Sequence, residues 1–192
     1  MSAELAKEKV LLHSCCGPCS TACIERILPD YDVTIFYYNP NITELEEYEK
    51  RKENQMLFIN EFNSKNETLD KVSFIEGEYL PDDFFEVASG YSNEPEGGKR
   101  CTECFKLRLE ATAQKAKKLG IPIFGTTLTV SPHKNYPLIS SIGNDLAVKY
   151  GLEFLDIDFK KKDGFKRSIE LSKEYGLYRQ DYCGCQYSKW HD

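Results

Sequence analysis

The stretch KVLLHSCCGPCSTACIERIL, residues 9–28, contains the pattern that decides the fold. Its first five residues form a short apolar run that predicts a buried strand. Pro18 suits the first turn of a helix, and the apolar face of that helix would comprise Cys23, Ile24, Ile27 and Leu28. A second apolar run, VTIFYY at residues 33–38, is rich in β-branched and aromatic residues and predicts another strand.

The same alternation of strand and helix continues along the chain. Further strands are predicted at 72–75, 121–125 and 153–157, with helices at 45–62, 101–119, 138–150 and 165–175. This order predicts an α/β protein with a parallel sheet between two helical layers and ligands bound at the carboxyl ends of the strands. We expect a single domain over residues 1–192, because no linker divides the chain. Residues 81–100 are predicted as an irregular loop, and residues 178–188 as a cysteine-containing C-terminal segment.

The charge balance argues against general affinity for nucleic acid. The chain has 25 Lys and Arg against 31 Asp and Glu, a formal net charge of -6, whereas such affinity requires several cationic contacts to phosphate. Basic clusters at 99–100, 106–108 and 160–167 are either local binding patches or solvated surface. The polar residues 1–9 do not resemble a secretory leader and no apolar run could cross a bilayer, so we expect a cytoplasmic protein without membrane partners.

Eight cysteines fall into three groups, namely Cys15, Cys16, Cys19 and Cys23; Cys101 and Cys104; and Cys183 and Cys185. Because thiols stay reduced in the cytoplasm, closely spaced cysteines there indicate metal binding or catalysis before structural disulfides. The first group opens a predicted helix, whose free amides and dipole should lower the thiol pKa. Cys23 lies one turn further on and is better explained as a small core residue.

The second and third groups together supply four thiols. Cys101 and Cys104 form a C-x-x-C at the start of a predicted helix, and Cys183 and Cys185 form a C-x-C around Gly184. Such pairs are typical of a four-thiolate centre, which is either structural zinc or an iron–sulfur cluster. Zinc would leave Cys15, Cys16 and Cys19 without a role, so we favour an iron–sulfur cluster beside a second, redox-active metal or thiolate site.

Two other functions fit parts of this pattern. CGPC at residues 16–19, between a strand and a helix, has the spacing of a thioredoxin-like dithiol oxidoreductase using Cys16 and Cys19. A zinc-stabilised nucleic-acid-binding module without chemistry is the other alternative.

Several further side chains are candidates for the site. Residues 126–135 are rich in hydroxyls after a predicted strand and include His133 and Lys134, so they suit an anionic or sugar-like ligand or an ordinary polar loop. Asp156 and Asp158 would share a strand face, where a proton carrier, a metal ligand, a helix cap or a salt bridge explains them. Tyr182, beside Cys183, is a candidate acid or a shield for the metal site, and His13 is more simply a packed or backbone-bonded residue.

Five motifs together resemble the QueH family of epoxyqueuosine reductases. They are HSCCGPC at 13–19, GGKRCTECF at 97–105, TTLTVSPHK at 126–134, KDGFKRSIELS at 162–172 and YRQDYCGC at 178–185. The resemblance covers residues 10–188 and implies an adenine-nucleotide hydrolase-like α/β/α fold. In that fold the first turn usually carries a Gly/Ser-rich pyrophosphate loop, whose place here is taken by cysteines.

The resemblance also implies a reaction and a ligand set. The reaction is reductive removal of the epoxide oxygen from epoxyqueuosine at the wobble position of tRNA, with an electron-donor protein or another reductant as partner. A [4Fe-4S] cluster is implied at Cys101, Cys104, Cys183 and Cys185. A second metal ion, iron, or an electron-transfer role is implied at Cys15, Cys16 and Cys19, although some members carry aspartate in place of Cys19. Tyr182, Asp158 and His133 are then the candidate proton sources.

Overall fold

In the computed structural model, residues 7–66 and 71–189 are described. Their centre is a five-stranded, all-parallel sheet in the order β3-β2-β1-β4-β5. The strands are β1 (Glu8–His13), β2 (Tyr31–Tyr37), β3 (Ser73–Glu76), β4 (Ile123–Thr126) and β5 (Glu153–Phe154). The helices are α1 (Gly17–Ile27), α2 (Leu45–Lys65), α3 (Pro81–Ala88), α4 (Lys99–Leu119), α5 (Tyr136–Tyr150) and α6 (Gly164–Glu174), with short 3-10 turns at Thr127–Val130 and Gln186–Ser188.

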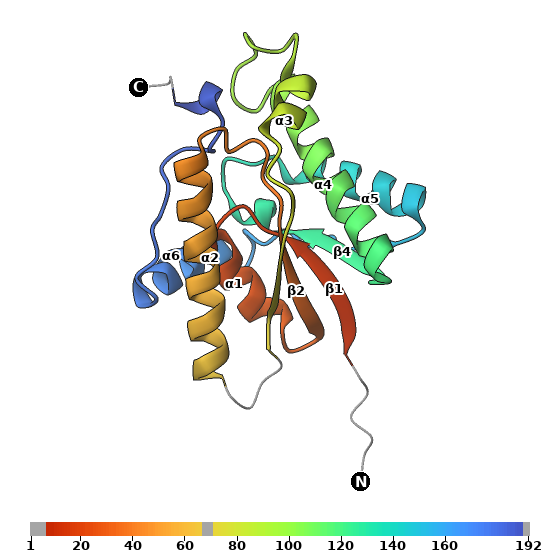
Figure 1. The fold of residues 1–192 in the computed structure, drawn as a ribbon. Helices are drawn as coiled ribbons and strands as arrows, with labels where there is room; N and C mark the ends of the chain where they lie inside the picture. The colour runs from red at the N-terminus through yellow and green to blue at the C-terminus, as the bar shows by residue number, and fades with distance from the viewer. Residues whose placement is uncertain (1–6, 67–70, 190–192) are drawn as a thin grey trace.

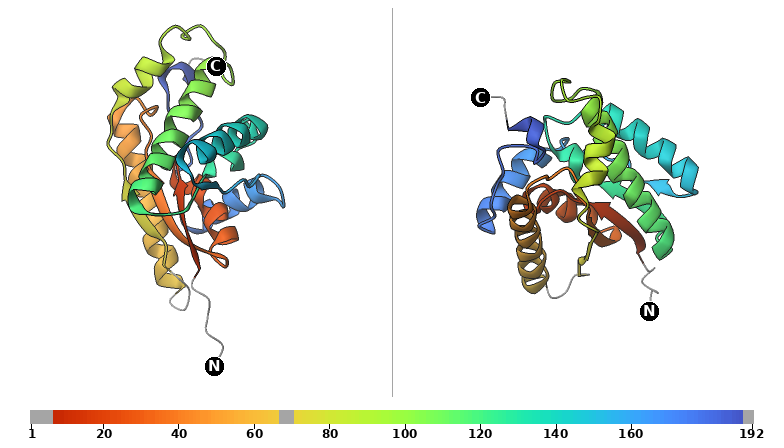
Figure 2. Two further views of the ribbon diagram at one scale, coloured as in Figure 1. Left: turned by 90° about the vertical axis from the view of Figure 1, so that its right-hand side faces the viewer. Right: turned by 45° about the horizontal axis from the view of Figure 1, so that its top comes forward.

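Helices cover both faces of the sheet, as Figure 1 shows. The alternation of side chains along β1 explains the two cores, because Val10 and Leu12 point to one face and Leu11 to the other. The first core receives apolar residues of α1, α2 and α6, and the second receives those of α4 and α5. α4 and α5 also pack against each other (Figure 2). The predicted three-layer α/β fold is therefore confirmed.

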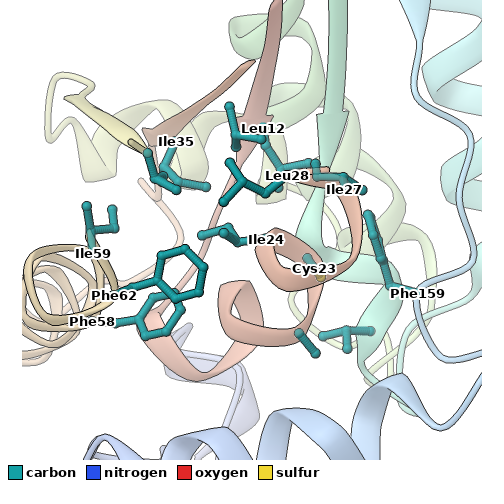
Figure 3. Close-up of a cluster of buried hydrophobic side chains, with 14 of the residues drawn as sticks. Leu12, Cys23, Ile24, Ile27, Leu28, Ile35, Phe58, Ile59, Phe62 and Phe159 are labelled. Atoms are coloured by element: carbon teal, nitrogen blue, oxygen red, sulfur yellow. The ribbon is translucent and has the colours of Figure 1, made fainter. Parts of the chain in front are cut away.

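The first core explains the role of Cys23. Its side chain is fully buried with Ile24 and Ile27 of α1 and with Phe159, and Figure 3 shows it among these apolar groups. The Cys23 thiol donates a hydrogen bond to the carbonyl of Cys19, 3.2 Å away. Cys23 is therefore a core residue, as the sequence favoured.

Two predicted segments differ in the structure. Within residues 81–100, Pro81–Ala88 forms α3, which buries Phe84 and Ala88 one turn apart. Its Pro81 and the acidic residues that follow are a helix-start signal within a segment that the sequence suggested was irregular. The last strand ends at Phe154 because the amide of Ile157 turns back to Leu155, so Asp156 and Asp158 do not share a strand face.

The order of the strands creates a crevice at one end of the sheet. β1 and β4 are neighbours, but the chain leaves β1 for α1 on one face and, after β4, reaches α5 on the other. Such a point of reversal is where open parallel sheets bind ligands. The cysteine-rich segment after β1 and the hydroxyl-rich segment after β4 both start there.

Candidate metal centre

Cys15, Cys16 and Cys19 form a compact group directly after β1, called here the three-cysteine site. Their sulfur atoms all lie within 4.8 Å of one another. Cys16 is the N-cap of α1, and its sulfur accepts a hydrogen bond from the amide of Cys19 at 3.4 Å. A metal ion bonded to thiolates at 2.3 Å separates them by about 3.8 Å in a tetrahedral site. The three-cysteine site therefore has the size that one metal ion requires.

Helix α2 holds this turn in place. Ser14 donates to the Gln55 side-chain oxygen at 2.7 Å, and the Gln55 amide donates to the Ser20 hydroxyl at 2.8 Å. Gln55 is fully buried and so fixes both ends of the cysteine turn. The turn approaches α2 so closely that a Cβ on Gly17 would lie 2.8 Å from the carbonyl oxygen of Asn54. Only glycine permits that approach without displacing α2.

The three thiols have different acidities. Hydrogen bonds from Cys16 and Cys19 hold the pKa of Cys15 well below its usual value, and the nearby charge of Arg108 acts in the same direction. Burial raises the pKa of Cys16 to about 12. Hydrogen bonding with Cys15 and Cys16 raises the pKa of Cys19. A lowered pKa is therefore found for one of the three thiols, and its cause is hydrogen bonding between neighbouring sulfurs, which share one negative charge when no metal is bound, and not the helix start that the sequence suggested.

Cys101 and Cys104 of α4 and Cys183 and Cys185 of the C-terminal segment come together in what is called here the four-cysteine site. They line one small cavity with Phe84, Phe105, Arg100, Arg108 and Lys134. Its polar contacts to sulfur include the amide of Gly97, 3.2 Å from Cys101, and the ammonium of Lys134, 3.4 Å from Cys183. Among the described residues, only the three-cysteine site has all its ligand atoms within 4.8 Å, so the four-cysteine site is wider than a single ion requires.

Two cationic side chains act on the four-cysteine site. A hydrogen bond from Cys185 lowers the pKa of Cys183, and Lys134 and Arg108 lower it further. Burial raises the pKa of Cys104 to about 11. Arg108 is 1% exposed, and one of its terminal nitrogens has no hydrogen-bond partner within residues 7–66 and 71–189. Because Arg108 also lines the larger cleft beside Cys15, it lies between the two sites.

The C-terminal segment reaches the site through contacts with α2. Arg51 donates to the carbonyls of Cys183 at 3.0 Å and Tyr182 at 3.2 Å, and pairs with Glu47 at 2.6 Å. Gly184 has φ +109, and a Cβ there would lie 2.9 Å from Ile42 and 3.1 Å from the Arg51 guanidinium. Both the positive φ and the close approach require glycine. The C-x-C loop is thus shaped by Gly184 and tied down by Arg51.

A cleft of about 980 Å³ opens onto the three-cysteine site. Cationic side chains outnumber acidic ones in its lining, which includes Arg51, Arg108, Lys134, Arg179 and Lys189 against Glu96 and Asp181. This local excess of positive charge contrasts with the formal charge of -6 for the whole chain. The cleft is therefore suited to an anionic ligand.

Of the three predicted proton sources, two line the cleft and one does not. Tyr182 and His133 line the cleft, and burial raises the pKa of the Tyr182 phenol. Asp158 lies outside the lining of both cavities and pairs with Lys160 at 3.6 Å, which is the salt-bridge alternative. Asp156 accepts hydrogen bonds from Tyr136, Ser140 and Asn144 and so braces α5. His13 is buried and contacts Thr126 and the carbonyl of Tyr38, as a packed residue would.

Comparison with known proteins assigns the chain to a family. The profile of the family described as Epoxyqueuosine reductase QueH matches residues 10–191. The chain belongs to the QueH family. This confirms the resemblance carried by the five motifs, which include all seven cysteines of the two sites.

Individual QueH proteins are similar over most of their length. The protein named Epoxyqueuosine reductase QueH from Streptococcus pyogenes serotype M1 is 43% identical over 185 residues, which cover 96% of this chain and 72% of that protein. The protein of that name from Staphylococcus epidermidis is 45% identical over 95% of this chain and 76% of its own length. The one from Thermotoga maritima is 40% identical, over 93% and 89%.

Sequence analysis missed three residues that organise the QueH site. Arg51 and Gln55 occur in LEEYEKRKENQ, whose many charges suggest a solvated helix. The sequence feature that indicates their burial is their spacing from Tyr48 and Phe58, because this spacing places all four residues on one face of the helix. Arg108 is one turn beyond Cys104 on α4, so its proximity to the cysteines was readable from the same spacing.

Proposed function

We propose that this chain is an epoxyqueuosine reductase that acts on tRNA carrying epoxyqueuosine at the wobble position. The epoxide oxygen leaves as water, two electrons and two protons are consumed, and queuosine with its carbon–carbon double bond is formed. The observation that carries the proposal is the meeting of seven cysteines in two adjacent groups at the sheet end of a QueH family member. A further domain is not required for this proposal, and residues 1–192 would act as one catalytic domain.

The donor atoms fit the two inorganic groups that the proposal needs. The four-cysteine site offers only thiols, is partly enclosed by Phe84 and Phe105, and is wider than a zinc site, which suits a [4Fe-4S] cluster. The three-cysteine site suits a single metal ion, for which we propose iron. A cluster bound by the four-cysteine site would supply electrons one at a time, and a metal ion bound by the three-cysteine site would supply Lewis acidity.

Side chains of the protein supply positive charge beside the cysteines and a proton for the reaction. Arg108 and Lys134 place positive charge beside the thiolates of the four-cysteine site, which reduces the cost of burying them. Tyr182 lines the cleft, and a phenol carries its proton at neutral pH. We assign Tyr182 as the proton donor toward the oxygen that leaves.

The cleft also fits a nucleotide presented by an RNA loop. Its cationic side chains can contact phosphates of the anticodon loop, and the rings of Phe165 and Tyr182 in its lining can stack on an unpaired base. Because few phosphates would be contacted, we expect modest tRNA affinity that falls as the salt concentration rises. Electrons would come from a donor protein or another low-potential reductant.

Anaerobic purification followed by analysis of iron and acid-labile sulfide tests the cofactors, and an assay on tRNA containing epoxyqueuosine tests the reaction. We expect about four sulfides for each chain and queuosine formation with a chemical reductant such as dithionite. Cys183→Ser should lose the cluster and the activity, whereas the control Cys23→Ala should keep both. A colourless protein with zinc alone would support the binding-module alternative, and an iron-free protein that reduces disulfides through Cys16 and Cys19 would support the dithiol alternative.

A further inference from the structure

Gln180 joins the C-terminal segment to the three-cysteine site. Its side-chain amide nitrogen lies 2.8 Å from the sulfur of Cys16 and 3.9 Å from that of Cys19. Gln180 lines the same cleft as Cys15 and Cys19, although 164 positions separate it from Cys16 in sequence. The contact is therefore made by the tertiary fold and not by a local turn.

The chemistry of this contact favours a charged sulfur. An amide NH₂ group has two donors, and a thiolate that binds a metal is an acceptor. Cys16 is 1% exposed, so the N–H groups of Gln180 and Cys19 take the place of water around its sulfur. Donors of this kind orient a metal ligand, and their loss typically weakens metal binding 10- to 100-fold.

The side-chain oxygen of the Gln180 amide makes no hydrogen bond that would stabilise the described part of the fold. This oxygen is also buried. A buried, unpaired carbonyl oxygen destabilises a fold. Stability of the fold alone therefore does not explain why a glutamine occupies this position, whereas a role toward the sulfurs does.

We propose that Gln180 is a positioning residue of the three-cysteine site, whose amide N–H groups hold the Cys16 sulfur in the arrangement that binds a metal ion. The inference rests on the proposed metal centre and names a residue that the motif pattern did not single out for it. Gln180 lies three positions before Cys183, so one segment supports both sites.

Binding of Co²⁺ alone tests this role in metal-free protein under anaerobic conditions. Co²⁺ bound to thiolates absorbs strongly, and the absorption that Cys16→Ser abolishes reports the three-cysteine site. We expect Gln180→Leu, which keeps the bulk but has no N–H, to raise the Kd of that site for Co²⁺ 10- to 100-fold. Gln180→Ala should do the same, and Gln180→Leu, which also removes the buried unpaired oxygen, should not lower the melting temperature of the metal-free protein.

Gln186→Ala is the matched control, because Gln186 is an exposed glutamine of the same segment with its side chain in solvent. It should bind Co²⁺ as the wild type does. Wild-type affinity in Gln180→Leu, or a loss confined to Gln180→Ala, would overturn the role of the N–H groups while leaving the metal centre intact. If the wild type shows no Co²⁺ signal that depends on Cys16, both the metal centre and the inference fail.

Discussion

Replacing Arg51 by methionine should remove the hydrogen bonds that hold the C-terminal segment against α2. Arg51 is 1% exposed and donates at 2.6 Å to Glu47 and at 3.0 and 3.2 Å to the carbonyls of Cys183 and Tyr182. Removing one partner of a buried ion pair costs about 3–5 kcal/mol, because the other charge stays buried and unpaired. Small domains have only about 5–15 kcal/mol of stability, so the change is a large fraction of the total.

The measurement is urea unfolding of metal-free protein together with iron content after anaerobic reconstitution. We expect Arg51→Met to lower both the unfolding free energy and the iron bound for each chain. Adding Glu47→Gln removes the unpaired carboxylate and should restore part of the stability but not the iron, because Cys183 and Tyr182 still lack their donor. Arg167→Met is the exposed control, since the Arg167–Glu25 pair is about two-fifths exposed at each side chain and should contribute less than about 1 kcal/mol.

A normal iron content in Arg51→Met would refute this reasoning. It would show that the C-x-C loop finds its position through Gly184 and the thiols alone. Equal stability losses in Arg51→Met and Arg167→Met would refute the assigned magnitude, since the two pairs differ mainly in burial.

Three further changes test other parts of the molecule. Gly184→Ala should lose iron and about 2 kcal/mol of stability in urea unfolding, whereas Gly90→Ala, also at positive φ but with open space around its Cβ, should lose less and keep iron. Burial lowers the pKa of His13 to about 4, so the His13 contribution to the unfolding free energy should be fully present above pH 6.5 and fall by up to about 3 kcal/mol between pH 6.5 and 4; His13→Gln should lose this part of the pH profile, and an unchanged profile in that variant would contradict this. Cys23→Ala should lower the unfolding free energy by about 1 kcal/mol and leave metal content unchanged, and a loss of iron would show that Cys23 is more than a core residue.

The three central strands, β1, β2 and β4, were predictable because their apolar runs are buried on both faces of the sheet. Val10, Leu11 and Leu12 are all fully buried, which is why KVLLH is apolar throughout. The length of the last strand was not predictable, because its end depends on where the amide of Ile157 turns back to Leu155. Helix α3, by contrast, could have been predicted from local sequence. Pro81 followed by Asp82 and Asp83 is a signal for a helix start, but the Gly and Glu residues further along the segment obscured it.

The sequence indicated which cysteines gather at the site, but it did not indicate the residues that support them. Thiols are few and chemically distinctive, so their spacing identifies them, and strand order brings the segment after β1 to the end of the sheet. Arg51 and Gln180 have no comparable sequence signal, because arginine and glutamine are common on protein surfaces. Their roles arise from contacts with Cys183 and Cys16, which lie 132 and 164 positions away in sequence.

The four-cysteine site takes two thiols from α4 and two from the C-terminal segment, so it is completed late during synthesis of the chain. Translation delivers the β1 thiols first, then those of α4, and Cys183 and Cys185 late. Before Cys183 and Cys185 are made, the strands of the sheet are already complete, but only two of the four thiols of the four-cysteine site are present. If the proposed cluster forms there, it can be completed only after Cys183 and Cys185 have been made, so insertion of iron and sulfide would follow the synthesis of the C-terminal segment.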